Sequence, residues 1–283
     1  MKYGVMLGSG RAAAGMRTIA GLTEDIVRFE RLGYDSVWAA DHLFIERNGE
    51  RRAPHDPLVL FAYAAARTQR IRLGSLVLGA PFRPVWQVAR EAVALSDASE
   101  GRFVLGLGAG WHQPEFDAFD IPFDHLVSRL ESQVTALQQH LFAGGRHSYE
   151  DRYVTLRDAE TLATAPPPPV WIAGKGPRML RLTARLADGW NVAWGGADPD
   201  WMTGTLDTLR RELDAAGRDP ATFTTSAAIS IPPGSDERQI AEAARAYERT
   251  GIDLLILGFW TGPGGQPNPE GPEVAAGALG LAD

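Results

Sequence analysis

The stretch VWIAGKGPRMLRLTARLADGWNVA (Val170–Ala193) holds two short apolar runs separated by a segment of helical period. The runs, Val170–Ala173 and Gly189–Ala193, carry no charged residue and are typical of strands that are covered on both faces. The segment between them, Pro177–Ala187, begins with a proline, which is favoured in the first turn of a helix. Two apolar strands joined by a helix form the repeating unit of a parallel sheet, so this stretch predicts an α/β fold.

The same alternation runs through the whole chain. Strands are predicted at Tyr3–Leu7, Ser36–Ala39, Ile71–Leu78, Phe103–Leu107, Val170–Ala173, Gly189–Ala193, Phe223–Ile231 and Leu254–Phe259. Helices are predicted at Thr23–Leu32, Pro57–Thr68, Val85–Ala98, Leu126–Phe142, Pro177–Ala187, Asp198–Ala216, Asp236–Thr250 and Pro272–Leu281. Eight strand–helix units in 283 residues favour one domain, a closed (β/α)8 TIM barrel over residues 1–283, with an open doubly wound sheet as the alternative.

Two segments interrupt this alternation. An insertion before the fifth strand, residues 144–165, contains HSYEDRYVTL (His147–Leu156), which predicts a short hairpin. The prolines that follow, Pro166–Pro169, cannot donate ladder hydrogen bonds and predict a stiff approach to the fifth strand. After the eighth strand, TGPGGQPNPEG (Thr261–Gly271) predicts an irregular loop.

The composition excludes several classes of function. The chain is 45% hydrophobic and 22% charged, which is ordinary for a globular protein, and its net charge of -7 argues against a general nucleic-acid surface. It has no cysteine, which excludes disulfides, thiolate zinc sites and cysteine nucleophiles, and its six scattered histidines predict no metal site. The first residues, MKYGVMLGSG, lack the pattern of a signal peptide, and no apolar run reaches the ~18 residues of a membrane span. We therefore expect a cytoplasmic protein without membrane contact.

Aromatic and polar residues concentrate where the predicted strands end, which is where the active sites of such barrels are built. Large aromatic side chains fill barrel mouths for packing alone, but an apolar cleft would also suit a flat ring cofactor. The residues expected to line a substrate pocket are Trp38, Trp111, Trp194 and Trp260.

The turn AGKGPR (Ala173–Arg178) joins the fifth strand to its helix. Free backbone N–H groups at a helix start, together with Lys175 and Arg178, have the chemistry of a phosphate site. The turn matches neither a Walker motif nor a dinucleotide fingerprint, and an ordinary βα turn with solvated basic residues is the alternative.

At the end of the second strand, His42 directly follows Asp41. A histidine in this place can exchange protons near neutral pH, or it can serve only as a structural hydrogen-bonding group. No G-x-S-x-G nucleophile elbow is present, so a serine hydrolase is not indicated.

The fourth strand runs into three glycines, Gly106, Gly108 and Gly110, and then into Trp111 and Glu115. In a barrel, such glycines are expected to let the backbone turn close beneath a flat ring where side chains would collide. Glu115 is expected to be a structural carboxylate at the start of a helix.

Four stretches, in this order along the chain, resemble the bacterial luciferase-like superfamily. They are WAADHL (Trp38–Leu43), IRLGSLVLGAPFRP (Ile71–Pro84), FVLGLGAGWHQPEFDAFDIPF (Phe103–Phe123) and WIAGKGPRMLRLTARLADGWN (Trp171–Asn191). These motifs are most similar to those of the branch that uses the deazaflavin coenzyme F420. FMN-dependent monooxygenases share the barrel and much of the pattern.

The resemblance implies roles for particular positions. It places Asp41 and His42 at the chemistry, with Asp41 orienting His42, and it implies a bulge around Leu76–Val77, often with a non-proline cis peptide, behind the cofactor ring. It also implies phosphate contacts from the fifth-strand loop. The cofactor-binding residues expected on this basis are Leu76, Val77, Gly108, Ala109, Ala173, Gly174, Lys175, Gly176 and Arg178.

One position departs from the pattern. Sugar-phosphate dehydrogenases of the deazaflavin branch carry a catalytic glutamate in the fourth-strand loop, where this chain has Ala109. Without that acid, glucose 6-phosphate is not the expected substrate.

The resemblance implies an F420-dependent oxidoreductase that moves a hydride between the deazaflavin and a small organic substrate, with His42 exchanging the proton. An FMN-dependent monooxygenase on the same fold and a non-catalytic flavin-binding protein are the alternatives. The expected partner is a small molecule, and a homodimer is expected because family members are commonly dimers.

Overall fold

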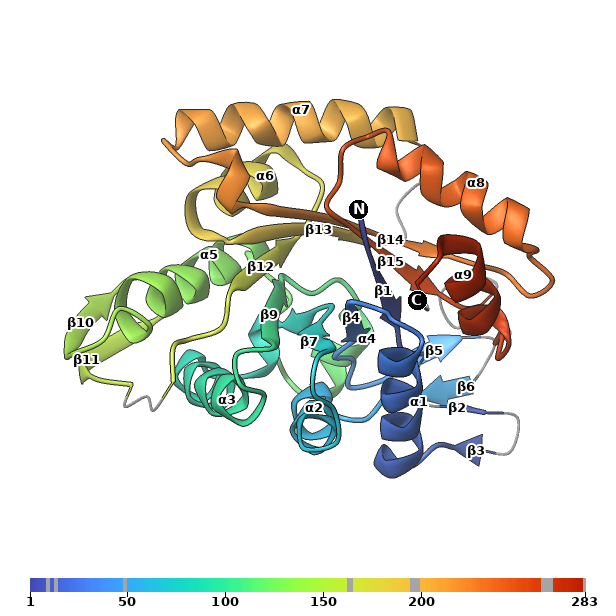
Figure 1. Ribbon diagram of the computed structural model, residues 1–283. Helices are drawn as coiled ribbons and strands as arrows, with labels where there is room; N and C mark the ends of the chain where they lie inside the picture. Colours follow the sequence, from blue (N-terminus) through green and yellow to red (C-terminus); the bar gives the residue numbers. More distant parts are fainter. Residues whose placement is uncertain are drawn as a thin grey trace.

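Eight parallel strands close into a barrel (Figure 1) in a computed structural model that describes residues 1–8, 11–12, 15–47, 50–161, 165–193, 199–260 and 267–281. The strands, in their order around the barrel, are β1 (Lys2–Met6), β4 (Ser36–Ala39), β7 (Arg72–Ser75), β9 (Phe103–Gly108), β12 (Val170–Ala173), β13 (Gly189–Ala193), β14 (Thr224–Ser230) and β15 (Leu254–Gly258). Pairing of β1 with β15 and of β9 with β12 completes the circle. The predicted TIM barrel is therefore confirmed, and the open sheet is excluded.

The helices alternate with the strands around the outside of this barrel. They are α1 (Ile19–Arg31), α2 (Pro57–Ala65), α3 (Val85–Ala98), α5 (Leu126–Ala136), α6 (Pro177–Leu186), α7 (Pro199–Ala215), α8 (Glu237–Glu248) and α9 (Gly271–Leu279). A π-helical turn, η2 (Leu137–Leu141), extends α5, and a short additional helix, α4 (Gln113–Ala118), follows the fourth strand. The side chain of Asp56 caps α2 at Leu58 and Val59, as the Asp-Pro sequence indicates.

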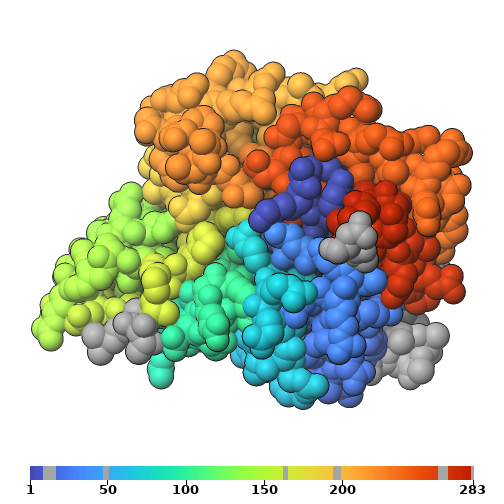
Figure 2. Space-filling model, in the orientation of Figure 1, coloured from blue at the N-terminus to red at the C-terminus, as the bar shows by residue number. Residues whose placement is uncertain are grey.

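The insertion before the fifth strand forms the predicted hairpin. Strands β10 (His147–Glu150) and β11 (Thr155–Ala159) pair antiparallel, and with α5 they project from one side of the barrel (Figure 2). Two other short hairpins, β2–β3 (Arg11–Ala12 with Gly15–Met16) and β5–β6 (Ile45–Arg47 with Glu50–Arg52), follow the first and second barrel strands. Strands of two or three residues are too short to show a period, so the sequence did not predict them.

The third strand is interrupted, although the sequence predicted one continuous run. Its two parts, β7 and β8 (Leu78–Gly79), both pair with β9, and the peptide bond between Leu76 and Val77 is cis. The bulge that the resemblance implied is therefore present. A short 3-10 turn, η1 (Ala80–Phe82), leads from it to α3.

Two indole rings fill the middle of the barrel. Trp38 and Trp171 stack with their ring centroids 5.0 Å apart. A Cβ atom on Gly74 would lie 2.3 Å from Trp38, and one on Gly189 would lie 2.5 Å from Trp171, so the glycines make room for the rings. Trp38, which was expected to line the substrate pocket, is thus buried among the side chains inside the barrel. Among the described residues, no helix is long and apolar enough to span a bilayer.

Candidate active site

The side chain of His42 is held by Glu115. The Nδ1 atom of His42 lies 3.0 Å from Glu115 Oε2, and the other carboxylate oxygen accepts hydrogen bonds from the backbone N–H groups of Leu43 (2.5 Å) and Phe44 (3.2 Å). Glu115 is fully buried in the first turn of α4, after the fourth strand. One carboxylate thus joins the loops that follow the second and fourth strands and fixes the histidine ring between them.

This contact corrects the expectation for Asp41 and extends the one for Glu115. Asp41 was expected to orient His42, but Glu115 does so from helix α4, 73 residues further along the chain. Glu115 is structural, as predicted, and it also contacts the candidate catalytic ring, which the prediction did not include.

The carboxylate of Asp41 binds Arg83 instead. Arg83 Nη1 lies 2.5 Å and Arg83 Nη2 3.1 Å from the two Asp41 oxygens, and Arg83 Nη2 also donates to Asp56 at 2.6 Å. The backbone N–H of Gly79 donates to the same carboxylate at 3.2 Å. Burial lowers the pKa of Arg83, but its hydrogen bonds with Asp41 and Asp56 outweigh this effect and raise the pKa above its ordinary value. Asp41 therefore anchors the end of the third strand to the second-strand loop beside His42.

Of the tryptophans that were expected around a substrate and that the structure describes, Trp111 is exposed near His42. Trp111 leaves 67% of its surface exposed, and its ring centroid lies 5.7 Å from that of His42. Trp260 is buried against the apolar residues inside the barrel. Trp194 lies outside the described residues. Trp111 is thus the described tryptophan that is available to contact a ligand beside His42.

The glycines at the end of the fourth strand serve the protein's own packing. A Cβ atom on Gly106 would lie 2.0 Å from the carbonyl oxygen of Ser75, and one on Gly108 would lie 2.5 Å from Val77. At Gly110, where φ is +84°, a Cβ atom would lie 2.6 Å from the ring of Phe116. These glycines therefore let the fourth strand approach the third-strand bulge and Phe116 closely.

The fifth-strand turn is held by its backbone and leaves the start of α6 open. The carbonyl of Gly174 accepts a hydrogen bond of 2.7 Å from Trp190 Nε1, and no side chain caps the helix at Gly176. A Cβ atom on Gly176 would meet nothing within 4 Å, and Lys175 is exposed beside it. The first N–H groups of a helix without a cap are free to bind an anion.

Arg178, which was also expected at this turn, points toward α5. Its guanidinium lies 2.9 Å from Ser128 Oγ and 3.1 Å from Glu131 Oε2. A phosphate at the start of α6 would therefore have Lys175 as its basic partner, with Arg178 engaged elsewhere. The other expected cofactor residues, Ala109 and Ala173, are half-buried at the ends of their strands.

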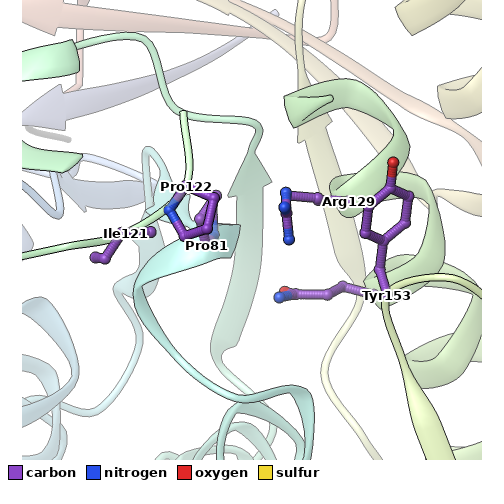
Figure 3. Close-up of a pocket in the computed structure, with 6 residues that line it drawn as sticks. Pro81, Ile121, Pro122, Arg129 and Tyr153 are labelled. Carbon is purple, nitrogen blue, oxygen red and sulfur yellow. The ribbon is translucent and has the colours of Figure 1, made fainter. Parts of the chain in front are cut away.

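A pocket of about 110 Å³ lies outside the barrel wall (Figure 3). Its lining residues are Pro81, Ile121, Pro122, Arg129, Gln133 and Tyr153. They come from η1, from the segment before α5, from α5 and from the β10–β11 hairpin. Arg129 is bound to Asp124 and lies 4.9 Å from the centre of the Tyr153 ring. Elsewhere in the described ranges, no three metal-ligating side chains gather.

The sequence pattern that defines luciferase-like monooxygenases matches residues 1–280, nearly the whole chain. The chain belongs to this luciferase-like family. The family resemblance read from the sequence is thereby confirmed.

Two curated relatives illustrate the range of substrates. The F420-dependent glucose-6-phosphate dehydrogenase of Kineococcus radiotolerans is 31% identical over 233 residues, which cover 80% of this chain and 68% of the relative. The phthiodiolone/phenolphthiodiolone dimycocerosates ketoreductase of Mycobacterium tuberculosis is 28% identical over 252 residues, which cover 80% of this chain and 64% of the relative. The chain thus spans about two thirds of the length of these relatives.

Solved structures share the barrel. An F420-dependent secondary alcohol dehydrogenase in complex with an F420–acetone adduct aligns with a TM-score of 0.85 at 15% identity, over 100% of this chain and 99% of its own. A monooxygenase from Streptomyces bottropensis aligns with a TM-score of 0.75 at 21% identity, over 99% of this chain and 97% of its own. At these identities the likeness shows the shared fold.

Sequence reasoning missed Arg83 as part of the site and missed the pairing of Glu115 with His42. The sequence did offer a signal for Arg83. This charged residue comes soon after the end of a buried strand, and a charged side chain that is buried needs a partner of opposite charge. No local pattern signals the Glu115–His42 pair, since the two residues lie on different loops.

Proposed function

We propose that this chain is an F420-dependent oxidoreductase that transfers a hydride between the deazaflavin and a small organic substrate. The observation that carries the proposal is His42, held at Nδ1 by Glu115 beside the exposed Trp111 at the end of the second strand. The sequence resemblance to the deazaflavin branch and the F420-dependent relatives support the choice of cofactor.

The residues present fit a phosphorylated flat-ring cofactor. The start of α6 has no side-chain cap, the space at Gly176 is open, and Lys175 adds a positive charge, which together suit a phosphate. The cis peptide at Leu76–Val77 lies where the family resemblance implies the support for the ring. Lys175, the N–H groups at the start of α6 and the Leu76–Val77 bulge would hold the cofactor.

His42 is built to exchange a proton at one defined atom. A carboxylate accepts hydrogen bonds only, so the Nδ1 atom that faces Glu115 carries the hydrogen, and Nε2 is the atom that takes up or releases a proton. Glu115 also stabilises the imidazolium when Nε2 is protonated. When bound, the deazaflavin supplies or accepts the hydride. Trp111 packs edge-on beside the imidazole.

The proposed substrate is a small molecule without a sugar phosphate. At Ala109 the chain lacks the carboxylate expected of the sugar-phosphate dehydrogenases in this branch. We propose an alcohol that is oxidised, or a carbonyl, imine or alkene that is reduced. Either class needs one proton at His42 Nε2 for each hydride moved.

An FMN-dependent monooxygenase is the second candidate. It is supported by the description of the family itself and by the fold shared with the Streptomyces bottropensis monooxygenase. The phosphate site at the start of α6 would bind the phosphate of FMN equally well. A non-catalytic flavin-binding protein would hold the cofactor with the same residues, and His42 would transfer no proton.

Titration of the purified chain with F420 and with FMN, followed by quenching of cofactor fluorescence, tests the proposal. Tight binding of F420 is expected, and binding of FMN without binding of F420 would overturn it. Turnover is then measured with F420 on a panel of alcohols and carbonyl compounds. His42→Ala should bind F420 normally and lose turnover, whereas His147→Ala, on the outlying β10–β11 hairpin, should keep both. Full turnover in His42→Ala contradicts the assigned role.

A further inference from the structure

Two large aromatic rings are exposed on the segment that follows the fourth strand, close to His42. Trp111 is 67% exposed, and Phe119, at the end of α4, is 56% exposed. Single apolar side chains on a surface are ordinary, whereas a connected group of them marks a surface that binds a ligand. Whether these two rings are connected is therefore decisive.

Ring contacts join the two exposed residues to each other and to His42. The centroid of the Trp111 ring lies 5.7 Å from that of His42 and 5.2 Å from that of His112. The centroid of Phe44 lies 6.1 Å from that of His112 and 6.3 Å from that of Phe119. We call Trp111, His112, Phe44 and Phe119 the aromatic strip. Because the strip begins at His42, a molecule that reacts there and extends past Trp111 lies along it.

The charges beside the strip are unfavourable for an anion. The segment from Trp111 to Phe123 contains three acidic residues and no lysine or arginine. Glu115 is buried, but Asp117 and Asp120 are exposed on either side of Phe119 in the sequence. A carboxylate or phosphate at the far end of the strip would be repelled by these two side chains.

Among the described residues, one cation does contact the strip. The guanidinium of Arg51 lies 4.0 Å from the centre of the Phe44 ring. The carboxylate of Glu46 accepts a hydrogen bond of 2.6 Å from Arg51 and neutralises its charge. The strip is therefore an apolar surface with an acidic border, which suits an uncharged ligand.

We propose that the substrate is an uncharged amphiphile, whose reacting group lies at His42 Nε2 and whose apolar part lies along the aromatic strip from Trp111 to Phe119. This inference rests on the proposed function, because it takes His42 as the residue that exchanges the proton. Burial of the apolar part against the rings supplies an affinity that grows with its length. Phe119 determines specificity in this arrangement, since it binds the far end of the substrate and leaves the proton exchange unchanged.

The first test measures binding without turnover. Saturation-transfer NMR on the full chain, with F420 present, gives the affinity for straight-chain alcohols from propanol to decanol. The affinity should rise by about fourfold for each added methylene group. Phe119→Ser should bind decanol about tenfold more weakly and propanol as wild type does, and Phe119→Leu should restore most of the loss.

Tyr63→Ser is the matched control, because Tyr63 is also an exposed aromatic residue but lies on α2, outside the barrel. It should bind the whole series as wild type does. An affinity that is independent of chain length, or that rises equally in wild type and Phe119→Ser, would overturn the proposal.

Kinetics separate this inference from the proposed function. With F420 and the alcohols, and with reduced F420 and the corresponding carbonyl compounds, KM should fall along the series. Phe119→Ser should raise KM for the longest members and leave kcat and the Kd of F420 unchanged. Turnover without dependence on chain length contradicts the inference alone. If the series binds as expected but turns over in neither direction, the failure lies in the proposed reaction and not in the strip.

The second test concerns the charge at the far end of the substrate. The ω-hydroxy acid of the same length as decanol should bind at least about fivefold more weakly at low salt, because its carboxylate meets Asp117 and Asp120. The difference should shrink in high salt and in the double variant Asp117→Asn with Asp120→Asn, since exposed charges are screened by salt. A hydroxy acid that binds wild type as tightly as decanol does would show that the strip does not select an uncharged ligand.

Discussion

Replacing Glu115 with glutamine separates the two tasks of this carboxylate. The amide keeps one oxygen, which can still accept from the N–H groups of Leu43 and Phe44, and it places an NH2 group opposite His42 Nδ1. That group donates, so the neutral imidazole must carry its proton on Nε2 and offer Nδ1 as the acceptor. The variant therefore keeps the fold and reverses the tautomer of His42.

The expected magnitudes follow from these contacts. A hydrogen bond to a charged acceptor contributes about 1 kcal/mol more than one to a neutral acceptor, so two backbone bonds lose about 2 kcal/mol of unfolding free energy. This corresponds to a Tm lowered by roughly 5 °C. Proton transfer by a positioned side chain contributes at least about 100-fold to rate, so kcat should fall by about that factor.

Two assays test this reasoning. Thermal unfolding and F420-dependent turnover are compared for wild type and Glu115→Gln, and ¹⁵N NMR of labelled histidine reports which imidazole nitrogen carries the proton without any substrate. Glu30→Gln is the matched control, because the Glu30 carboxylate likewise accepts from backbone N–H groups, in its case the three of Gln69, Arg70 and Ile71. It should lower the Tm and leave turnover unchanged. Wild-type turnover in Glu115→Gln, with the proton still on Nδ1, would refute the assignment.

Three further predictions concern binding and stability. Lys175→Ala should weaken F420 binding by about tenfold in a fluorescence titration, whereas Arg178→Ala, which removes a side chain engaged with α5, should change it less than twofold. Arg83→Met should lower the free energy of unfolding in urea by about 3–5 kcal/mol, since it leaves the buried Asp41 carboxylate without its partner; an unchanged midpoint would contradict this. Burial raises the pKa of Glu30, but its three backbone donors outweigh burial and hold the pKa below its usual range. The stability that the ionised Glu30 contributes is therefore complete above the unfolded-state pKa of about 4.3 and is lost as the pH falls through the lower folded-state pKa. In Glu30→Gln, the free energy of unfolding should therefore fall less steeply as the pH is lowered through this range.

Most of the fold could be predicted because its signals are local. The predicted strands Ser36–Ala39, Val170–Ala173 and Gly189–Ala193 and the helix Val85–Ala98 have the predicted ends in the structure. The predicted ends of an element differ from the observed ends where the local sequence signal is weak. Helix α1, for example, begins at Ile19 with Thr18 as its N-cap, four residues before the predicted start at Thr23.

The candidate site was predicted in part. The strand ends pointed to His42 and to the open turn at Gly176, because the carboxyl ends of parallel strands meet on one side of a barrel. The bulge at Leu76–Val77 was implied by the family resemblance and is present. The partner of Asp41 was not predicted, nor was the stacking of Trp38 on Trp171 inside the barrel.

The sequence by itself determined the type and order of most elements and the side of the sheet on which its polar residues collect, and it favoured a closed barrel. These follow from hydrophobic period and turn chemistry, which act over a few residues. Only the tertiary structure decided that Glu115 holds His42 and that Gly106 clears space for Ser75. Such contacts depend on how neighbouring strands and loops are positioned to within an ångström or so, and residues 73 positions apart carry no local record of that distance.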